Sequence, residues 1–224
     1  MLRELWARGP LRGTLWALRQ MYSRRKFLVL THSLGQSPSI IPPPGVVVRE
    51  VARLDEEVLC AISRAWPAEF GSYRAEYLKA RFCRRQEEGA WCLVARSGGR
   101  VAGAVWLSRA EPVPAHCLGG HNGCQRTVQS LFVCSSLRGK GVGKALLAEA
   151  LVLARSRGVG RVASRILPWR TASLCVHVSL GFSIDGILIE TTLLGRDYCH
   201  VCSPWNGRLP QVRRALHGPA SGKE

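Results

Sequence analysis

The stretch of the chain with the clearest chemistry is residues 138–144, which read Arg-Gly-Lys-Gly-Val-Gly-Lys. Glycine occupies every other position, and because glycine has no Cβ atom, a ligand can approach the main chain closely there. An apolar run precedes this segment and a helical pattern follows it, so its N–H groups are expected to open a helix. The basic residues add positive charge to that helix N-terminus. The segment therefore predicts a binding site for a diphosphate.

Two familiar phosphate-binding motifs do not fit this segment. A P-loop would need glycine where the chain has Arg138, and serine or threonine where it has Ala145. The dinucleotide fingerprint G-x-G-x-x-G has a different spacing from the alternating glycines found here. The sequence thus indicates a diphosphate site of another kind.

A second informative segment follows the next predicted strand. Residues 170–182 read Arg-Thr-Ala-Ser-Leu-Cys-Val-His-Val-Ser-Leu-Gly-Phe, and they predict a helix that ends at Gly181. Together the two segments resemble the GNAT family of N-acetyltransferases. Residues 138–143 match the acyl-CoA signature of that family, R/Q-x-x-G-x-G/A. The resemblance extends over about residues 46–195 and includes the order and spacing of the predicted elements.

The second segment keeps its family pattern, N-x-x-A-x-x-x-Y-x-x-x-G-F, only in part. Arg170 and Ser173 stand at the Asn and Ala positions, and His177 stands where the family often has a tyrosine that protonates the leaving thiolate. The resemblance therefore implies His177 as the candidate catalytic residue. An imidazole with its usual pKa of about 6.5 could donate a proton or a hydrogen bond to the sulfur. The alternative is a histidine that simply packs against the sheet.

The resemblance also implies a fold and a ligand. The fold is α/β (α+β), with a mixed, mostly antiparallel central sheet, helices on both faces and a V-shaped splay between two central strands. Pantetheine of acetyl-CoA, or of another acyl-CoA, would pair with one strand of the splay, and its pyrophosphate would lie on the glycine turn. The implied cofactor-binding residues are Leu131, Phe132, Val133, Arg138, Gly139, Lys140, Gly141, Val142, Gly143, Lys144, Arg170 and Ser173.

The implied activity is N-acetyl transfer, in which a primary amine of a small molecule or peptide attacks the thioester directly in a ternary complex. The general base stays open, because the strand before the turn carries Gln129 and Ser130 where the family often has glutamate. A chain of waters could serve, and the candidate side chains are Glu69, His116, His121 and Glu190. Two alternatives remain: a catalytically weak or inactive CoA-binding module, and a basic surface-binding protein.

The elements that must position these residues follow from periodicity and turn residues. Strands are expected at 46–48, 90–96, 101–109, 127–134, 161–167, 182–194 and 197–203, and helices at 55–65, 73–88, 141–157 and 171–180. A hairpin turn is expected at Ser97-Gly98-Gly99-Arg100. This order of elements is typical of a mixed sheet with helices on its faces.

Three segments are expected along the chain. Residues 1–45 would hold a basic amphipathic helix, a short strand at 26–30 and a Pro-rich linker; residues 46–203 would form the acyltransferase domain. Residues 204–224 read as a flexible basic tail. The amphipathic stretch could pack on its own domain or on a second subunit, and contact with an anionic membrane through residues 1–25 stays open.

Composition limits the remaining possibilities. The 224 residues are 46% hydrophobic, which can build a core, and they contain no apolar run near the ~18–20 residues of a transmembrane helix. The 32 basic and 15 acidic residues give a net charge of +17, which favours an anionic partner. A nucleic acid is not expected, because no aromatic–basic reader motif appears. Nine cysteines and no apparent secretion signal favour the cytoplasm, and a homodimer stays open.

One loop contains possible metal ligands. His116, Cys117, His121 and Cys124 lie within nine residues, but they do not form the separated Cys pairs that structural zinc sites favour. We therefore expect loop thiols and solvated imidazoles here, and no bound metal.

Overall fold

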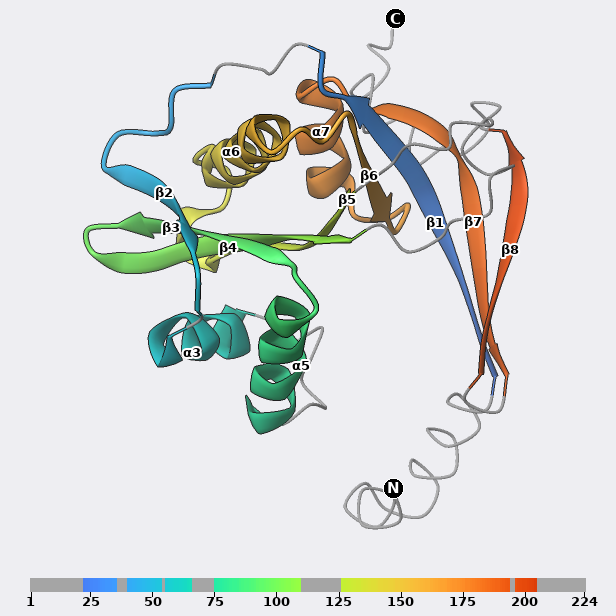
Figure 1. Cartoon of the computed structure of the whole chain (residues 1–224), viewed down its shortest axis with the longest axis horizontal. Coiled ribbons are helices and arrows are strands. Elements are labelled where there is room, and N and C mark those ends of the chain that lie inside the picture. Colours follow the sequence, from blue (N-terminus) through green and yellow to red (C-terminus); the bar gives the residue numbers. More distant parts are fainter. Residues whose placement is uncertain are drawn as a thin grey trace, which may run out of the picture.

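The computed structural model describes residues 22–35, 40–53, 55–65, 75–109, 126–193 and 196–204. These residues form an 8-stranded sheet with helices on both faces (Figure 1). The strands are β1 (Tyr22–Ser33), β2 (Val46–Val51), β3 (Trp91–Ser97), β4 (Arg100–Arg109), β5 (Arg126–Val133), β6 (Arg161–Ile166), β7 (Ser183–Leu193) and β8 (Arg196–Pro204). The helices are α3 (Glu56–Ala65), α5 (Ala75–Glu87), α6 (Val142–Ser156) and α7 (Thr171–Ser179), with the short 3-10 helix η2 (Ser135–Leu137) before α6.

Each strand and helix that the sequence predicts from Val46 onward is present, with bounds that differ by a few residues. Local chemistry explains this agreement. Gly98 and Gly99 have φ angles of 56° and 79°, which suit a two-residue hairpin turn between β3 and β4. Gly158 and Gly181 also have positive φ angles, and they end α6 and α7 as left-handed caps.

The sheet is mixed and mostly antiparallel, as predicted. Its strand order is β2-β3-β4-β5-β6-β1-β7-β8, and β5 with β6 is the parallel pair. Their ladder contains three residue pairs, from Arg126 with Val162 to Val128 with Ser164. Beyond Val128 and Ser164 the two strands diverge, which confirms the predicted V-shaped splay.

The N-terminal strand differs from its prediction. The short strand expected at 26–30 is the 12-residue strand β1, and it lies inside the sheet between β6 and β7, antiparallel to both. Leu28 and Leu30 of β1 are fully buried in the main core. The strand that precedes the Pro-rich linker thus belongs to the same sheet as the strands that follow it. Sequence periodicity identifies a strand but not its neighbours, because pairing depends on distant residues.

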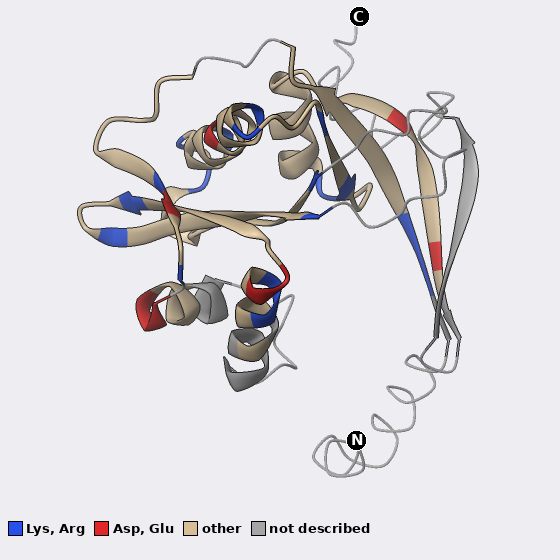
Figure 2. Cartoon of the chain, viewed as in Figure 1, with Lys and Arg blue, Asp and Glu red and all other residues tan. Residues whose placement is uncertain are grey.

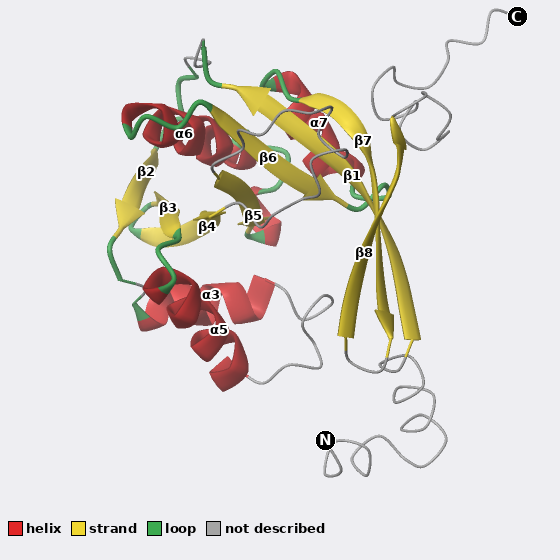
Figure 3. Cartoon of the chain, turned by 45° about the vertical axis from the view of Figure 1, so that its right-hand side comes forward, coloured by secondary structure: helices red, strands yellow, loops and turns green. Residues whose placement is uncertain are grey.

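Two hydrophobic cores lie on opposite faces of the sheet. Helices α6 and α7 cover one face, and α3 and α5 cover the other (Figures 1 and 3). Strand β4 contributes to both cores, since residues 101–107 are all buried. On the α3/α5 face, the ring of Trp106 stacks on Phe82 with 4.5 Å between centroids. The central strands are therefore apolar on both sides, which explains their continuous hydrophobic runs.

Lys and Arg residues are spread over helices and strands rather than gathered on one element (Figure 2). Several of them are used in ion pairs that join separate elements, such as Arg157 with Glu50 at 2.7 Å and Arg161 with Asp185 at 3.1 Å. Among the helices that the structure describes, none has the length and apolarity that crossing a bilayer requires.

Gly103 of β4 provides a test of how closely the sheet and α6 pack. A Cβ atom at this position would lie 2.5 Å from the carbonyl oxygen of Phe132 and 3.0 Å from a methyl group of Leu146. We expect Gly103→Ala to lower the free energy of unfolding by about 2 kcal/mol, because the β5 backbone must move. At Gly160 a Cβ atom would meet nothing within 4 Å, so Gly160→Ala is the matched control. Urea unfolding of both variants checks this, and equal stabilities would contradict it.

Candidate active site

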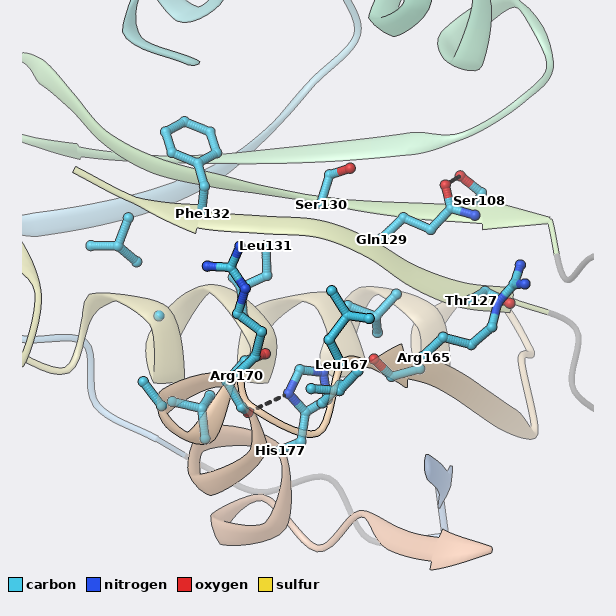
Figure 4. Close-up of a pocket in the computed structure, with 18 of the residues that line it drawn as sticks. Ser108, Thr127, Gln129, Ser130, Leu131, Phe132, Arg165, Leu167, Arg170 and His177 are labelled. Atoms are coloured by element: carbon cyan, nitrogen blue, oxygen red, sulfur yellow. Dashed lines mark hydrogen bonds between the residues drawn. The ribbon is translucent and has the colours of Figure 1, made fainter. Parts of the chain in front are cut away.

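A cleft of about 1650 Å³ opens where β5 and β6 diverge (Figure 4). Strand β5 forms one wall, and β6 with α7 forms the other. The glycine turn and the start of α6 lie at one end of the cleft, and residues of α5 and the end of β4 lie at the other. The two segments singled out by the sequence thus border the same cavity.

The predicted cofactor-binding residues line this cleft with one exception. Lys140 is exposed and is not among the lining residues, although both glycines beside it are. The side chain of Phe132 is also directed away from the divergent strands, and it is buried in the core on the α3/α5 face (Figure 4). The other predicted cofactor-binding residues therefore line the cleft, and some of them do so with their peptide groups.

Peptide groups of β5 face the cleft at alternate positions. The N–H of Cys134 donates to the carbonyl of Ala102 in β4 at 2.9 Å, so Phe132, two residues earlier, also directs its peptide groups toward β4. Leu131 and Val133 consequently direct theirs into the cleft. The backbone of Phe132 was expected to pair with the ligand, but it is directed toward β4. Of the three predicted residues of β5, only Leu131 and Val133 direct their peptide groups into the cleft.

A β-bulge interrupts β5 in the middle of this wall. Ala104 pairs with Phe132 and Trp106 pairs with Gln129, so Ser130 and Leu131 lie together opposite one residue of β4. Ser130 has a φ angle of 55°, a left-handed conformation that is uncommon outside glycine. The bulge changes the direction of the strand where the cleft begins to widen.

The glycine turn exposes main-chain N–H groups at the mouth of α6. Gly139 and Gly141 have φ angles of 76° and 82°, and Gly141 is the N-cap of the helix that starts at Val142. The first helical N–H groups have no acceptor in a preceding turn, and they carry the positive end of the helix dipole. A Cβ atom at Gly143 would lie 3.3 Å from a methyl group of Val133, so glycine also allows α6 to approach β5. The turn can hold a diphosphate.

Basic side chains border the same turn. Arg138 is exposed, and its Nε donates to the carbonyl of Val133 at 3.2 Å. Lys144 is half-buried and lines the cleft, and Arg170 lines it from the residue before α7. Trp169, next to Arg170, is 60% exposed at the cleft. These cations complement an anionic ligand held by the N–H groups.

His177 lines the cleft from α7 with a ring that is 1% exposed. Its Nδ1 lies 2.8 Å from the backbone oxygen of Ser173 (Figure 4), and since a carbonyl only accepts hydrogen bonds, Nδ1 carries the proton. Burial lowers the pKa of His177 to about 4, and the bond to Ser173 opposes this only in part. The ring is therefore neutral at pH 7, and its Nε2 is a buried acceptor without a partner among the described residues. The sequence led us to expect a ring that donates a proton to the leaving sulfur, whereas the Nε2 of this neutral ring carries no proton.

Charged side chains that the sequence did not single out line the α5 end of the cleft. Arg85 donates from Nη1 to the hydroxyl of Ser130 at 2.7 Å. Arg165 of β6 pairs with Glu190 of β7 at 2.7 Å, so one of the candidate bases is held in an ion pair. A charge inside a strand whose neighbours are buried was the available signal for Arg165. Arg85 gave no such signal, because charges on one helix face usually mark solvent exposure.

The structure does not test the other residues that the sequence proposed as a general base or as metal ligands. The possible bases Glu69, His116 and His121 lie outside the described residues, as does the loop with the possible metal ligands. Among the residues that the structure describes, no three His, Cys, Asp or Glu side chains gather as a metal site.

A family model for the acetyltransferase (GNAT) family matches residues 55–182, which is more than half of the chain. The chain belongs to the GNAT family. A search of curated protein sequences finds no match to it. The matched residues include the divergent strands, the glycine turn and His177, so family membership and the cleft rest on the same part of the chain.

Solved structures show the same fold at low sequence identity. A GCN5-related N-acetyltransferase from Sphaerobacter thermophilus aligns with a TM-score of 0.53 and 20% identity, over 84% of this chain and 58% of that one. A Drosophila protein aligns with a TM-score of 0.52 and 17% identity, over 83% and 57%. A conserved protein of unknown function from Staphylococcus epidermidis gives 0.53 and 12%, over 80% and 66%. The chain thus spans less than two thirds of the length of these chains.

The neutral state of His177 predicts a pH dependence of stability. The unfolded imidazole takes up a proton near pH 6.5, whereas the folded ring resists protonation until about pH 4. The unfolded state therefore binds more protons in this window, and the free energy of unfolding should fall by about 3 kcal/mol as the pH drops from 6.5 to 4. The variant His177→Gln removes this titration and should show a shallower slope in urea unfolding between pH 7 and 4. Identical slopes for the two proteins would contradict a neutral buried ring.

Proposed function

We propose that the protein is an acyl-CoA-dependent N-acyltransferase that moves an acetyl group from acetyl-CoA to a primary amine. The observation that carries the proposal is the meeting of two features in one cleft: peptide groups of β5 that face away from β4 beyond the ladder with β6, and N–H groups at a glycine turn. A ligand with a diphosphate at one end and amides along its length fits both features. Membership of the GNAT family supports the same reaction class.

Different residues of the cleft would bind the pyrophosphate and the pantetheine of the proposed acyl-CoA donor. The N–H groups of Gly139 and of Gly141 through Lys144, with the side chains of Arg138 and Arg170, would hold the pyrophosphate. The peptide groups of Leu131 and Val133 would pair with the amides of pantetheine, as a strand pairs with its neighbour. This arrangement directs the thioester toward the bulge at Ser130.

The proposed reaction is a direct transfer in a ternary complex. The amine loses a proton, its nitrogen bonds to the thioester carbonyl carbon, and the carbon–sulfur bond breaks to release the CoA thiolate. His177 is neutral with Nδ1 bonded to Ser173, so at pH 7 it can accept a hydrogen bond through Nε2 but has no proton there to give. The thiolate of CoA leaves without a protein proton donor in this proposal. Water is the proposed route for the proton of the amine, since Glu190 is held by Arg165.

A substitution in the glycine turn tests the donor site. Gly139 and Gly158 have nearly equal φ angles, 76° and 74°, and a Cβ atom at either would meet no protein atom within 4 Å. Alanine should therefore strain both positions equally, but Gly139 lines the cleft and Gly158 lies beyond the far end of α6. We expect Gly139→Ala to weaken CoA binding about 10-fold or more, and Gly158→Ala to leave it unchanged. Isothermal titration with CoA measures this, and unchanged affinity in Gly139→Ala would contradict the diphosphate site.

Release of free CoA thiol in the presence of acetyl-CoA and a panel of primary amines tests the activity. We expect amine-dependent thiol release with matching amounts of N-acetylated product. A second candidate function, a module that binds CoA without turnover, is favoured by the neutral buried state of His177. CoA binding without thiol release from any amine would support that alternative and overturn the transferase proposal.

A further inference from the structure

Two turns border one end of the cleft, because the strands that precede them are parallel. The carboxyl ends of neighbouring parallel strands reach the same edge of a sheet, and β5 and β6 are such a pair. The glycine turn follows β5, residues 167–170 follow β6, and both segments line the cleft. Figure 4 shows Arg170 toward the Leu131 end of β5, whereas Arg165 lies toward Thr127. The turn after β6 therefore shares an end of the cleft with the proposed diphosphate site.

The turn after β6 presents a large aromatic side chain at the cleft. Arg170 donates its backbone N–H to the carbonyl of Leu167 at 2.9 Å, which closes a β-turn with Pro168 and Trp169 in its central positions. Proline suits the first central position, because its ring fixes φ at about −65°. Pro168 is buried, whereas Trp169 is 60% exposed and lines the cleft. The turn thus anchors itself through proline and leaves the indole at the cavity.

The other tryptophans that the structure describes have their rings covered. Trp106 is fully buried and stacks on another core ring. Trp91 has the guanidinium groups of Arg126 and Arg157 at 3.8 and 4.4 Å from its ring centroid. For Trp169, by contrast, no ring or guanidinium contact is found within the described part of the chain. An uncovered aromatic side chain beside a cavity indicates a surface for binding rather than for packing.

A flat aromatic group is the ligand that such a surface suits best. The bases of nucleotides stack on exposed aromatic side chains, because every base has a π face. In the proposed complex, pantetheine extends from the pyrophosphate along β5 toward the bulge at Ser130. The adenosine at the other side of the pyrophosphate therefore extends away from the bulge, at the end of the cleft that Trp169 borders.

We infer that the indole of Trp169 stacks on the adenine of the acyl-CoA donor, so that the protein selects a donor that carries a nucleotide. This inference rests on the proposed function and specifies its donor class. Acyl groups are also carried by carrier proteins, in which phosphopantetheine is attached to a serine and no adenine is present. Such a donor would contact β5 and part of the glycine turn but would leave Trp169 uncovered. We therefore expect acetyl-CoA to be a better donor than an acetylated carrier protein.

Three ligands separate the base from the rest of the donor. CoA and 3′-dephospho-CoA contain adenine, whereas 4′-phosphopantetheine ends at its phosphate. We expect Trp169→Ala to weaken the binding of both adenine-containing ligands about 10-fold, because base–aromatic stacking is lost, and to leave the affinity for 4′-phosphopantetheine unchanged. Trp169→Phe should recover most of this loss, because it keeps an aromatic ring. Isothermal titration measures the three affinities.

A control variant and a second readout exclude a merely structural effect. Val47 of β2 is 51% exposed and does not line the cleft, so Val47→Ala should leave all three affinities unchanged. Circular dichroism checks that each variant is folded. A base that stacks on an indole quenches its fluorescence, so CoA should quench the emission of the wild type more than that of Trp169→Phe. With 4′-phosphopantetheine the two proteins should be quenched alike.

The outcomes distinguish this inference from the proposed function. An equal loss of affinity for CoA and 4′-phosphopantetheine in Trp169→Ala would overturn the inference, because Trp169 would then only support the shape of the cleft. Unchanged affinities would also overturn it, and amine-dependent thiol release would leave the transferase proposal standing. A loss confined to the adenine-containing ligands, without thiol release from any amine, would support the inference and overturn the transferase proposal. A wild-type protein that does not bind CoA would overturn both.

Discussion

The site depends on the point at which β5 and β6 stop pairing. After Val128 and Ser164 the two strands diverge, and within the described part of the chain no strand pairs with this edge of β5 beyond that point. Buried peptide groups are nearly always hydrogen-bonded, so an open edge inside a domain is costly unless a ligand or water completes it. The fold holds this edge open by rigid contacts on its other side, where β4 pairs with β5 and Gly103 allows their close approach. In the proposed complex, the acyl-CoA would bond to this edge and extend the sheet.

The local parts of this architecture could be predicted from the sequence, because they depend on neighbouring residues. Left-handed glycines end helices and close hairpins wherever the backbone requires a positive φ, and the alternating glycines mark the mouth of α6 in the same way. The place of β1 could not be predicted. Its six pairs with β6 and its ladder with β7 join residues at least 128 positions apart, and no local pattern specifies such partners.

The site residues show the same division between local and non-local causes. The sequence identified His177 as a residue of interest, but its protonation state depends on its burial beside Phe182 and on the carbonyl of Ser173. Lys140 looked equivalent to its basic neighbours in the sequence, yet it does not line the cleft. Arg85 and Arg165 are 80 positions apart in the sequence, and only the tertiary fold brings both to one cleft. A sequence motif can identify the residues of a turn, because they are adjacent in the chain. The charged residues around a cavity come from distant elements, so they cannot be identified in this way.

The position of β1 explains how the second wall of the cleft is held. Strand β6 has three pairs with β5 but six with β1, so most of its backbone bonds come from the N-terminal strand. Polar contacts reinforce this arrangement across β1: Thr31 donates to Asp185 at 2.6 Å, and Arg161 of β6 donates to both. Phe27 of β1 itself lines the cleft. A strand that precedes the Pro-rich linker therefore holds β6 along the side that faces away from β5. The cleft is a product of the whole chain from β1 to β7, and the GNAT segment that the family model matches does not contain all of the residues that shape it.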